Sequence, residues 1–337
     1  MFTFGLAHGP KAFDPLVLLL LAMVAEGLAG FVRTWSAGVP SPVRLIAGLT
    51  RFFDRKLNRE RRSQTDRAIR GVLVTLFILA LCFAIGAGVL WVAGHVTYGW
   101  ILELSLTASL LAQRRAFDRA WDIRKALTRG DLDEARRVTA AATGKDAVVY
   151  DRHALSRGAI ETMTETFVTG VVAPVFWFVL FGFPGLLLSR AVFAMASVLD
   201  QPAAHYRAFG LTAGRLNDAL LFIPARLAAL FIAAAAAFAP TARPGQAMKT
   251  MGRDGGKHAS LNFGWPVAAM AGALTLSLAG PKPGHNTAAT TPWIGEGTAR
   301  AEPHDIKRAL YIFGVACLLN LACLAALAVI RYGLPGR

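Results

Sequence analysis

Residues 71–94 read GVLVTLFILALCFAIGAGVLWVAG, and this run decides the class of fold. It contains no charged side chain. As an α-helix it would be about 36 Å long, which is enough to cross a bilayer core of about 30 Å. The whole chain agrees, because 55% of its residues are hydrophobic, only 17% are charged and its mean hydropathy is +0.46. We therefore expect an all-α integral membrane protein.

Other apolar runs extend this interpretation to a polytopic protein. Residues 15–32, 101–112 and 311–330 are further candidates for membrane segments. Two more runs, 166–199 and 219–240, are interrupted by glycine, proline or arginine. Irregular backbone at membrane depth is tolerated only where protein or a water-filled cavity covers it. We expect about four to six membrane segments in a single membrane domain, with some helices broken or re-entrant.

The charge is distributed unevenly along the chain. The net charge is +15, and residues 33–70 hold ten basic side chains against three acidic ones. Basic residues collect in cytoplasmic loops of membrane proteins, so we assign 33–70 to a basic cytoplasmic loop. Within it, residues 44–57 carry apolar side chains at helical spacing and predict an amphipathic helix on membrane lipid. The sequence shows no nucleic-acid-binding motif, and we expect no nucleic-acid partner.

Two further segments are more polar. Residues 114–165 form a predicted cytoplasmic helical insert, in which Asp131 begins a helix with Glu134 three residues later, the spacing of a capping box. Residues 241–308 form a polar loop region. Within it, GRDGG at 252–256 indicates little beyond flexibility. The three cysteines lie in apolar runs without metal-ligand spacing, so we predict no metal site built from them.

Several stretches occur in the same order as the motifs of one family of membrane proteins. Residues 41–49 read SPVRLIAGL, where that family has HPVRLIG. Residues 161–177 read ETMTETFVTGVVAPVFW, similar to ESLAENFVDGVVAPLFW, and residues 262–274, NFGWPVAAMAGAL, resemble NAGWPEAAMAGAL. The resemblance also includes LTRGDLDEAR at 127–136, GKD at 144–146, HYRAFGLTAGRLNDALLFIPARLAAL at 205–230 and PWIG at 292–295. Together these stretches resemble the CobD/CbiB membrane proteins of cobalamin biosynthesis, the adenosylcobinamide-phosphate synthases.

The resemblance implies a reaction and a place for it. The family joins aminopropanol phosphate or ethanolamine phosphate to a carboxylate of adenosylcobyric acid, forming an amide at the expense of ATP. It implies a multi-pass protein of the bacterial inner membrane, a corrinoid substrate, and ATP with magnesium as cofactors. Such chemistry needs acidic oxygen ligands for magnesium, basic residues for phosphates and a base for the amine.

The resemblance also singles out candidate site residues. The catalytic candidates are Glu161, Glu165 and Asp218. A second set of basic and polar residues would bind the substrates or ATP, namely Arg44, Arg190, Arg207, Arg215, Arg226, Asn262 and Trp265. Alternatively, the two glutamates form a solvated helix end. Arg207, Arg215 and Arg226 could equally anchor the chain at the membrane interface or pair with Asp218.

The chain departs from the family pattern at several acidic or amide positions. Where the family has an acidic or amide side chain, this chain has Thr166, Thr169, Phe193, Ala196, Ala208 and Val267. Magnesium binding requires several oxygen ligands, so these losses weaken the prediction of an ordinary magnesium site.

Two function classes follow. The first is the family enzyme with a diverged site. The alternative is a catalytically inactive paralogue that serves as an accessory subunit, with a membrane-protein partner and no cofactor. A third class, a membrane sensor of the AmpE-like kind, matches the sequence less closely.

Overall fold

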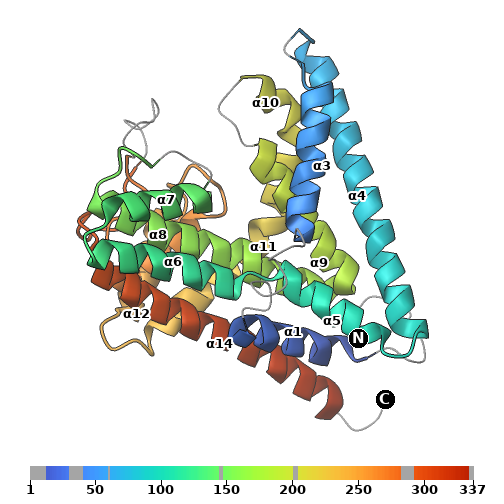
Figure 1. Cartoon of the computed structure of the whole chain (residues 1–337). Coiled ribbons are helices and arrows are strands. Elements are labelled where there is room, and N and C mark those ends of the chain that lie inside the picture. Colours follow the sequence, from blue (N-terminus) through green and yellow to red (C-terminus); the bar gives the residue numbers. More distant parts are fainter. Residues whose placement is uncertain are drawn as a thin grey trace. The chain divides into compact units, whose positions relative to one another are not determined.

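The computed structural model describes residues 13–29, 41–59, 61–143, 147–199, 204–281 and 292–333. The described part is built from helices and contains two isolated β-bridges (Figure 1). This confirms the all-α prediction. The GKD stretch at 144–146 and residues 200–203 and 282–291 lie outside the described residues.

Four helices are long and apolar enough to cross a membrane. They span Gln64–His95, Arg152–Leu199, Leu211–Ala236 and Pro303–Arg331. In the helix Gln64–His95, only a third of the most apolar stretch is buried inside the protein. Large apolar side chains of this helix are exposed. The exposed residues on this helix include Leu73, Leu76, Phe77, Phe83, Ile85 and Trp91. An apolar surface of this size is typical of a lipid-facing helix, and the chain is a polytopic membrane protein.

Two predicted segments are shorter than a full span. Helix α1 (Pro15–Ala29) has 15 residues and α5 (Gly99–Leu110) has 12. At 1.5 Å per residue they measure about 22 Å and about 18 Å, less than the bilayer core of about 30 Å.

The chain forms two compact units. The first contains residues up to Leu111, Ala173–Leu221 and the residues from Leu324 onward. Besides α1 and α5, its described residues form the helices α3 (Pro42–Leu57), α4 (Gln64–His95), α9 (Ala173–Leu199) and α10 (Ala204–Phe209). The amphipathic helix predicted at 44–57 is therefore present as α3, which packs beside α4 (Figure 1).

Helix α9 is broken, as the glycine and proline pattern predicts. Gly182 has a φ of 67°, which is outside the helical region, and Pro184 follows two residues later. A left-handed φ favours glycine because the residue has no Cβ. Pro184 also lies against α4, where a Cβ on Gly86 would come 3.0 Å from the Pro184 Cα. The broken helix and α4 therefore approach each other closely.

The second unit contains Ala112–Val172 and Phe222–Cys323. Its helices include α6 (Gln113–Thr128), α7 (Leu132–Thr143) and α8 (Arg152–Phe167), which pack together (Figure 1). The predicted start of α7 is confirmed, since the Asp131 Oδ1 accepts a hydrogen bond from the Glu134 N–H at 2.9 Å. Helix α11 (Leu211–Ala236) passes from the first unit into the second. Helix α14 (Pro303–Gly333) begins in the second unit and ends in the first.

The region predicted as polar loops, residues 241–308, contains two more helices. They are α12 (Pro244–Asp254) and α13 (Gly264–Leu274), which pack against each other. Helix α13 is buried along its whole length except for Trp265, which is half-buried. This small-residue helix also contacts α8. The second unit therefore brings the ETMTET and NFGW stretches into neighbouring helices.

Candidate functional site

Glu161 lies on α8, and its carboxylate is buried. It is only 4% exposed, and its Oε1 accepts a hydrogen bond from the Ala279 N–H at 2.8 Å. Ala279 has a φ of 60°, an unusual value for a residue with a Cβ. Glu161 therefore holds the turn after α13 in place. The alternative of a solvated helix end does not apply to this residue.

The residues after Glu161 include Thr166 and Thr169, which replace an amide and an acidic residue of the family pattern. Helix α8 continues into a π-helical turn, η1 (Val168–Val172). The Thr166 Oγ1 donates to the Thr162 carbonyl at 2.7 Å, and the Thr169 Oγ1 donates to the Glu165 carbonyl at 3.1 Å. Both hydroxyls are thus directed to the helix backbone. Glu165, on the same helix, is half-buried.

Gly170 allows a close approach within this turn. A Cβ on Gly170 would come 2.7 Å from the Ala112 Cβ, closer than real Cβ atoms pack. The Ala112 N–H donates to the Gly170 carbonyl at 2.9 Å. π-helical turns occur often at functional sites. Here the turn fixes the start of α6 against the end of α8.

Asp254 is the most highly connected carboxylate of this unit. It is 1% exposed, and its oxygens accept hydrogen bonds from Arg253 at 2.8 and 2.6 Å. The Lys257 Nζ lies 2.6 Å from Oδ1, and the Gly295 N–H donates to Oδ2 at 3.0 Å. The Arg253 hydrogen bonds first, then Lys257 and Gly295, hold the pKa of Asp254 well below its usual range, although burial opposes this. Asp254 therefore ties the GRDGGK stretch to the PWIG stretch.

The PWIG stretch has a second attachment to the unit. The Arg157 guanidinium lies over the Trp293 ring, 5.3 Å from its centroid, and its Nη1 donates to the Ala299 carbonyl. Isolated β-bridges join Leu276 to Thr298 and Leu278 to Ile294. α8, the turn after α13 and the PWIG stretch thus meet in one place.

Arg226 connects α11 with the NFGW stretch. Its guanidinium lies 3.8 Å from the Phe222 ring centroid and 5.0 Å from that of Trp265. The Nη1 donates to the Asn262 Oδ1 at 2.7 Å and to the Phe222 carbonyl at 2.9 Å. Both hydrogen bonds use Nη1, so Nε and Nη2 make none to the residues that the structure describes. The N–H groups of these two nitrogens are available to a bound carboxylate or phosphate.

The structure therefore brings three predicted site residues, Arg226, Asn262 and Trp265, into direct contact. Glu161 and Glu165 lie on α8 in the same unit. The other five lie in the first unit. Arg44, Arg207 and Arg215 are exposed, Asp218 is half-buried, and Arg190 is 4% exposed with its guanidinium 5.3 Å from the Phe193 ring centroid.

The contacts of Asp254 with Arg253, Lys257 and Gly295 were not predicted from the sequence. The interpretation of residues 252–256 as flexible is wrong, because Asp254 ends α12 and is buried with two cations. The available signal was one acid between two bases, Arg253 and Lys257, within five residues. Glycines surround these charges and obscured that signal.

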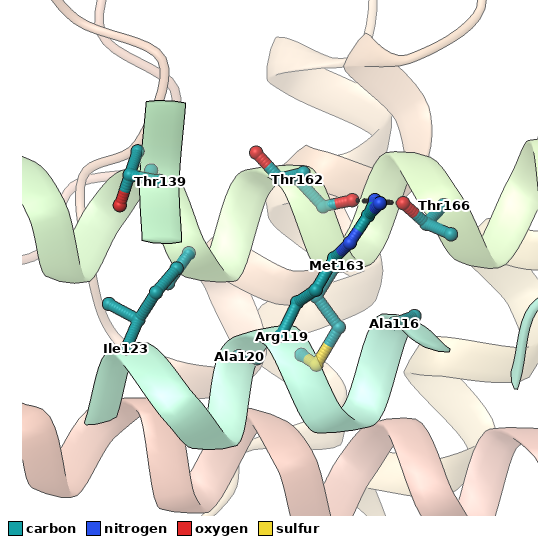
Figure 2. Close-up of a pocket in the computed structure, with 10 residues that line it drawn as sticks. Ala116, Arg119, Ala120, Ile123, Thr139, Thr162, Met163 and Thr166 are labelled. Carbon is teal, nitrogen blue, oxygen red and sulfur yellow. Dashed lines mark hydrogen bonds between the residues drawn. The ribbon is translucent and has the colours of Figure 1, made fainter. Parts of the chain in front are cut away.

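A small pocket lies between α6, α7 and α8 (Figure 2). Its lining includes Arg119, Thr139, Thr162, Met163 and Thr166. Its volume is about 10 Å³, which is room for one water molecule and not for a substrate. Within the described ranges, no three His, Cys, Asp or Glu side chains gather in a metal-binding arrangement.

Comparison with known proteins identifies the family. The family model described as CobD/Cbib protein matches residues 19–313. The chain belongs to the CobD/CbiB family. A "Cobalamin biosynthesis protein CobD" of Sinorhizobium sp is 35% identical over 326 residues, covering 94% of this chain and 98% of that protein. Proteins of the same description are 31% identical in Citrobacter koseri (93% and 97% covered) and 33% identical in Rhodobacter capsulatus (88% and 92%). No solved structure matches the chain.

Family membership agrees with the geometry above. The family model includes both helices that carry the glutamates and Arg226, and it extends past the PWIG stretch. The relatives match nearly the full length of the chain, so both compact units belong to the family fold. The chain is thus a CobD/CbiB-family protein of cobalamin biosynthesis.

Proposed function

We propose that this protein forms the amide bond between a carboxylate of adenosylcobyric acid and aminopropanol phosphate or ethanolamine phosphate, driven by ATP. The observation that carries the proposal is the convergence of four family-like stretches in the second unit. There Arg226 of IPAR donates a hydrogen bond to Asn262 of NFGW. Helix α8, which carries ETMTET, contacts the turn after α13 through Glu161 and Ala279, and contacts Trp293 of PWIG through Arg157. We place the protein in the bacterial inner membrane, with this unit facing the cytoplasm, where ATP is present.

Arg226 is our candidate for binding an anionic substrate group. Two aromatic rings hold its guanidinium and Asn262 fixes one edge, so the remaining N–H groups keep a constant direction. A fixed guanidinium favours bidentate binding of carboxylate or phosphate. The corrinoid carboxylate and the phosphate of the amino alcohol are both groups of this kind.

Glu165 is our candidate for the base. An amine attacks a carbonyl carbon only when its lone pair is free, so a proton has to leave the nitrogen. Glu161 already accepts a hydrogen bond from the Ala279 N–H, and Asp254 is bound to two cations. Glu165 lies one helical turn from Glu161 and is half-buried instead of buried, so a bound amine reaches its carboxylate more easily than that of Glu161.

Of the two expected cofactors, the described residues suit the phosphates of ATP but do not form a cage for magnesium. Lys257, whose side chain is 49% exposed, and Arg226 suit the phosphates of ATP, which when bound supplies the phosphoryl group that activates the carboxylate. A protein-built magnesium cage does not fit, because the described residues form no cluster of three acidic, His or Cys ligands.

The alternative of an inactive accessory subunit rests on the replaced acidic and amide residues, and the comparisons with known proteins add nothing in its favour. Expression of the full chain in a bacterium that lacks its own cobinamide-phosphate synthase tests the proposal. With cobyric acid as the corrinoid source, cobalamin-dependent growth supports the synthase. Absence of growth from protein that is shown to be inserted and folded would overturn it.

A further inference from the structure

A polar pocket of about 240 Å³ lies between α12 and α13, apart from the contacts of Arg226 and Glu161. Residues of both helices line it, among them Gln246, Thr250, Gly272 and Thr275. Arg243 and Glu296 complete the wall. The volume is far larger than one water molecule needs and is sufficient for a phosphate group with a short chain attached.

The positive end of α12 faces this pocket. The helix begins with Pro244 after Arg243, and no side chain caps its first turn. The first backbone N–H groups of a helix lack partners within the helix and carry a partial positive charge. Gln246, in this first turn, lines the pocket. An uncapped helix start of this kind attracts an anion.

Thr250 gives an independent indication of a ligand. It lines the pocket and is 1% exposed, yet its Oγ1 has no hydrogen-bond partner among the described residues. A Cβ on Gly272 would come 2.8 Å from this oxygen, so only glycine allows α13 to pack this close to the hydroxyl. Buried hydroxyls are seldom left unpaired, and each such case calls for an explanation. A ligand oxygen would supply the missing partner.

The charges around the pocket also favour an anion. Arg243 is exposed at the helix start. The pocket's carboxylate, that of Glu296, forms an ion pair with Arg253. The negative charge on the wall is therefore compensated, and the charge of Arg243 is added to that of the helix end.

We propose that this pocket binds the phosphate group of a small ligand, through Arg243, the first turn of α12 and the Thr250 hydroxyl. The group is a phosphate monoester, either of a soluble metabolite or of a lipid headgroup. The inference does not depend on the proposed reaction, because phosphate binding is measured without turnover.

Phosphorus NMR on the full-length protein in detergent micelles tests the proposal, with inorganic phosphate as the probe at constant ionic strength. The wild-type protein should bind it with a millimolar dissociation constant or better. Arg243→Gln should weaken binding about tenfold, since a charge-assisted hydrogen bond is lost. Thr250→Val should weaken it several-fold without lowering the melting temperature, because the hydroxyl has no partner within the protein.

Lys249→Gln is the matched control. It removes one charge from the same helix at an exposed residue outside the pocket lining, and it should leave affinity within about twofold of wild type. No binding by the wild type, or equal affinity in wild type, Arg243→Gln and Thr250→Val, would overturn the proposal.

Nanodiscs distinguish the two sources of phosphate. If the natural ligand is soluble, affinity for inorganic phosphate is the same in phosphatidylcholine discs with and without phosphatidic acid, whose headgroup is a phosphate monoester. If it is a lipid headgroup, phosphatidic acid competes with inorganic phosphate in the wild type. Arg243→Gln then reduces that competition.

Discussion

The Asp254 carboxylate accepts a hydrogen bond from the Gly295 N–H at 3.0 Å, across 41 residues of sequence. Gly295 has a φ of 97°, a conformation that other residues rarely adopt. The same carboxylate binds Arg253 and Lys257. One buried acid therefore orders a glycine turn and two cations, and its removal should affect both stability and activity.

Asp254→Asn should lower the free energy of unfolding by about 2 kcal/mol, since hydrogen bonds to a charged group are weakened or lost. The loss is not larger because Arg253 and Lys257 are 32% and 49% exposed and are hydrated when freed. Thermal unfolding in detergent measures the effect. Asp133→Asn, in an ion pair whose acid is 94% exposed, is the control and should change stability by less than about 0.5 kcal/mol.

The lowered pKa of Asp254 predicts a pH dependence of stability. The unfolded chain takes up the proton near the ordinary pKa of about 3.9, before the folded protein does. The contribution of Asp254 is therefore complete above that pH and is lost as the pH falls toward the folded-state pKa. The melting temperature should decrease below about pH 5, and the decrease should be smaller in Asp254→Asn. Equal decreases in both proteins would contradict this assignment.

Glu161 offers a test between a structural and a catalytic role. Its observed role is to accept the Ala279 N–H, which a glutamine oxygen can also do. Glu161→Gln should retain the fold and support growth in the complementation assay, whereas Glu161→Ala should lower stability by about 1–3 kcal/mol. A stable Glu161→Gln protein that does not support growth would assign this carboxylate to the chemistry.

Gly170→Ala should destabilise the protein, because the new Cβ would come 2.7 Å from the Ala112 Cβ. Overpacking of this kind costs about 1–3 kcal/mol. Gly158→Ala is the matched control, since Gly158 lies on α8 and a Cβ there meets nothing within 4 Å. It should be neutral or raise stability by up to about 1 kcal/mol through helix propensity. Melting temperatures of both variants decide the comparison.

The helical class and the membrane character could be predicted from hydropathy alone, because a run such as residues 71–94 has few other stable conformations. The break near Gly182 could also be predicted, from GFPG. The π-helical turn could not, because it depends on the contact between Gly170 and Ala112. Helix α12 was missed because its sequence, PGQAMKTMGRD, is polar and is stabilised by packing on α13.

The candidate site was predicted less completely. Resemblance located Arg226, Asn262 and Trp265, and the structure shows them in contact. The role of Glu161 as a partner of Ala279 could not be foreseen, since 118 residues separate them. The same applies to Asp254, whose partners Arg253 and Lys257 are local but whose contact with Gly295 depends on the tertiary fold.

Amide formation by the purified protein is the most direct test of the central claim. The full-length chain in detergent is mixed with adenosylcobyric acid, aminopropanol phosphate, ATP and magnesium, and the product is followed by mass spectrometry. We predict an amide product from the wild type and a loss of at least tenfold in Arg226→Ala, with Lys249→Gln unchanged. A folded wild-type protein that forms no product under these conditions would contradict the synthase assignment.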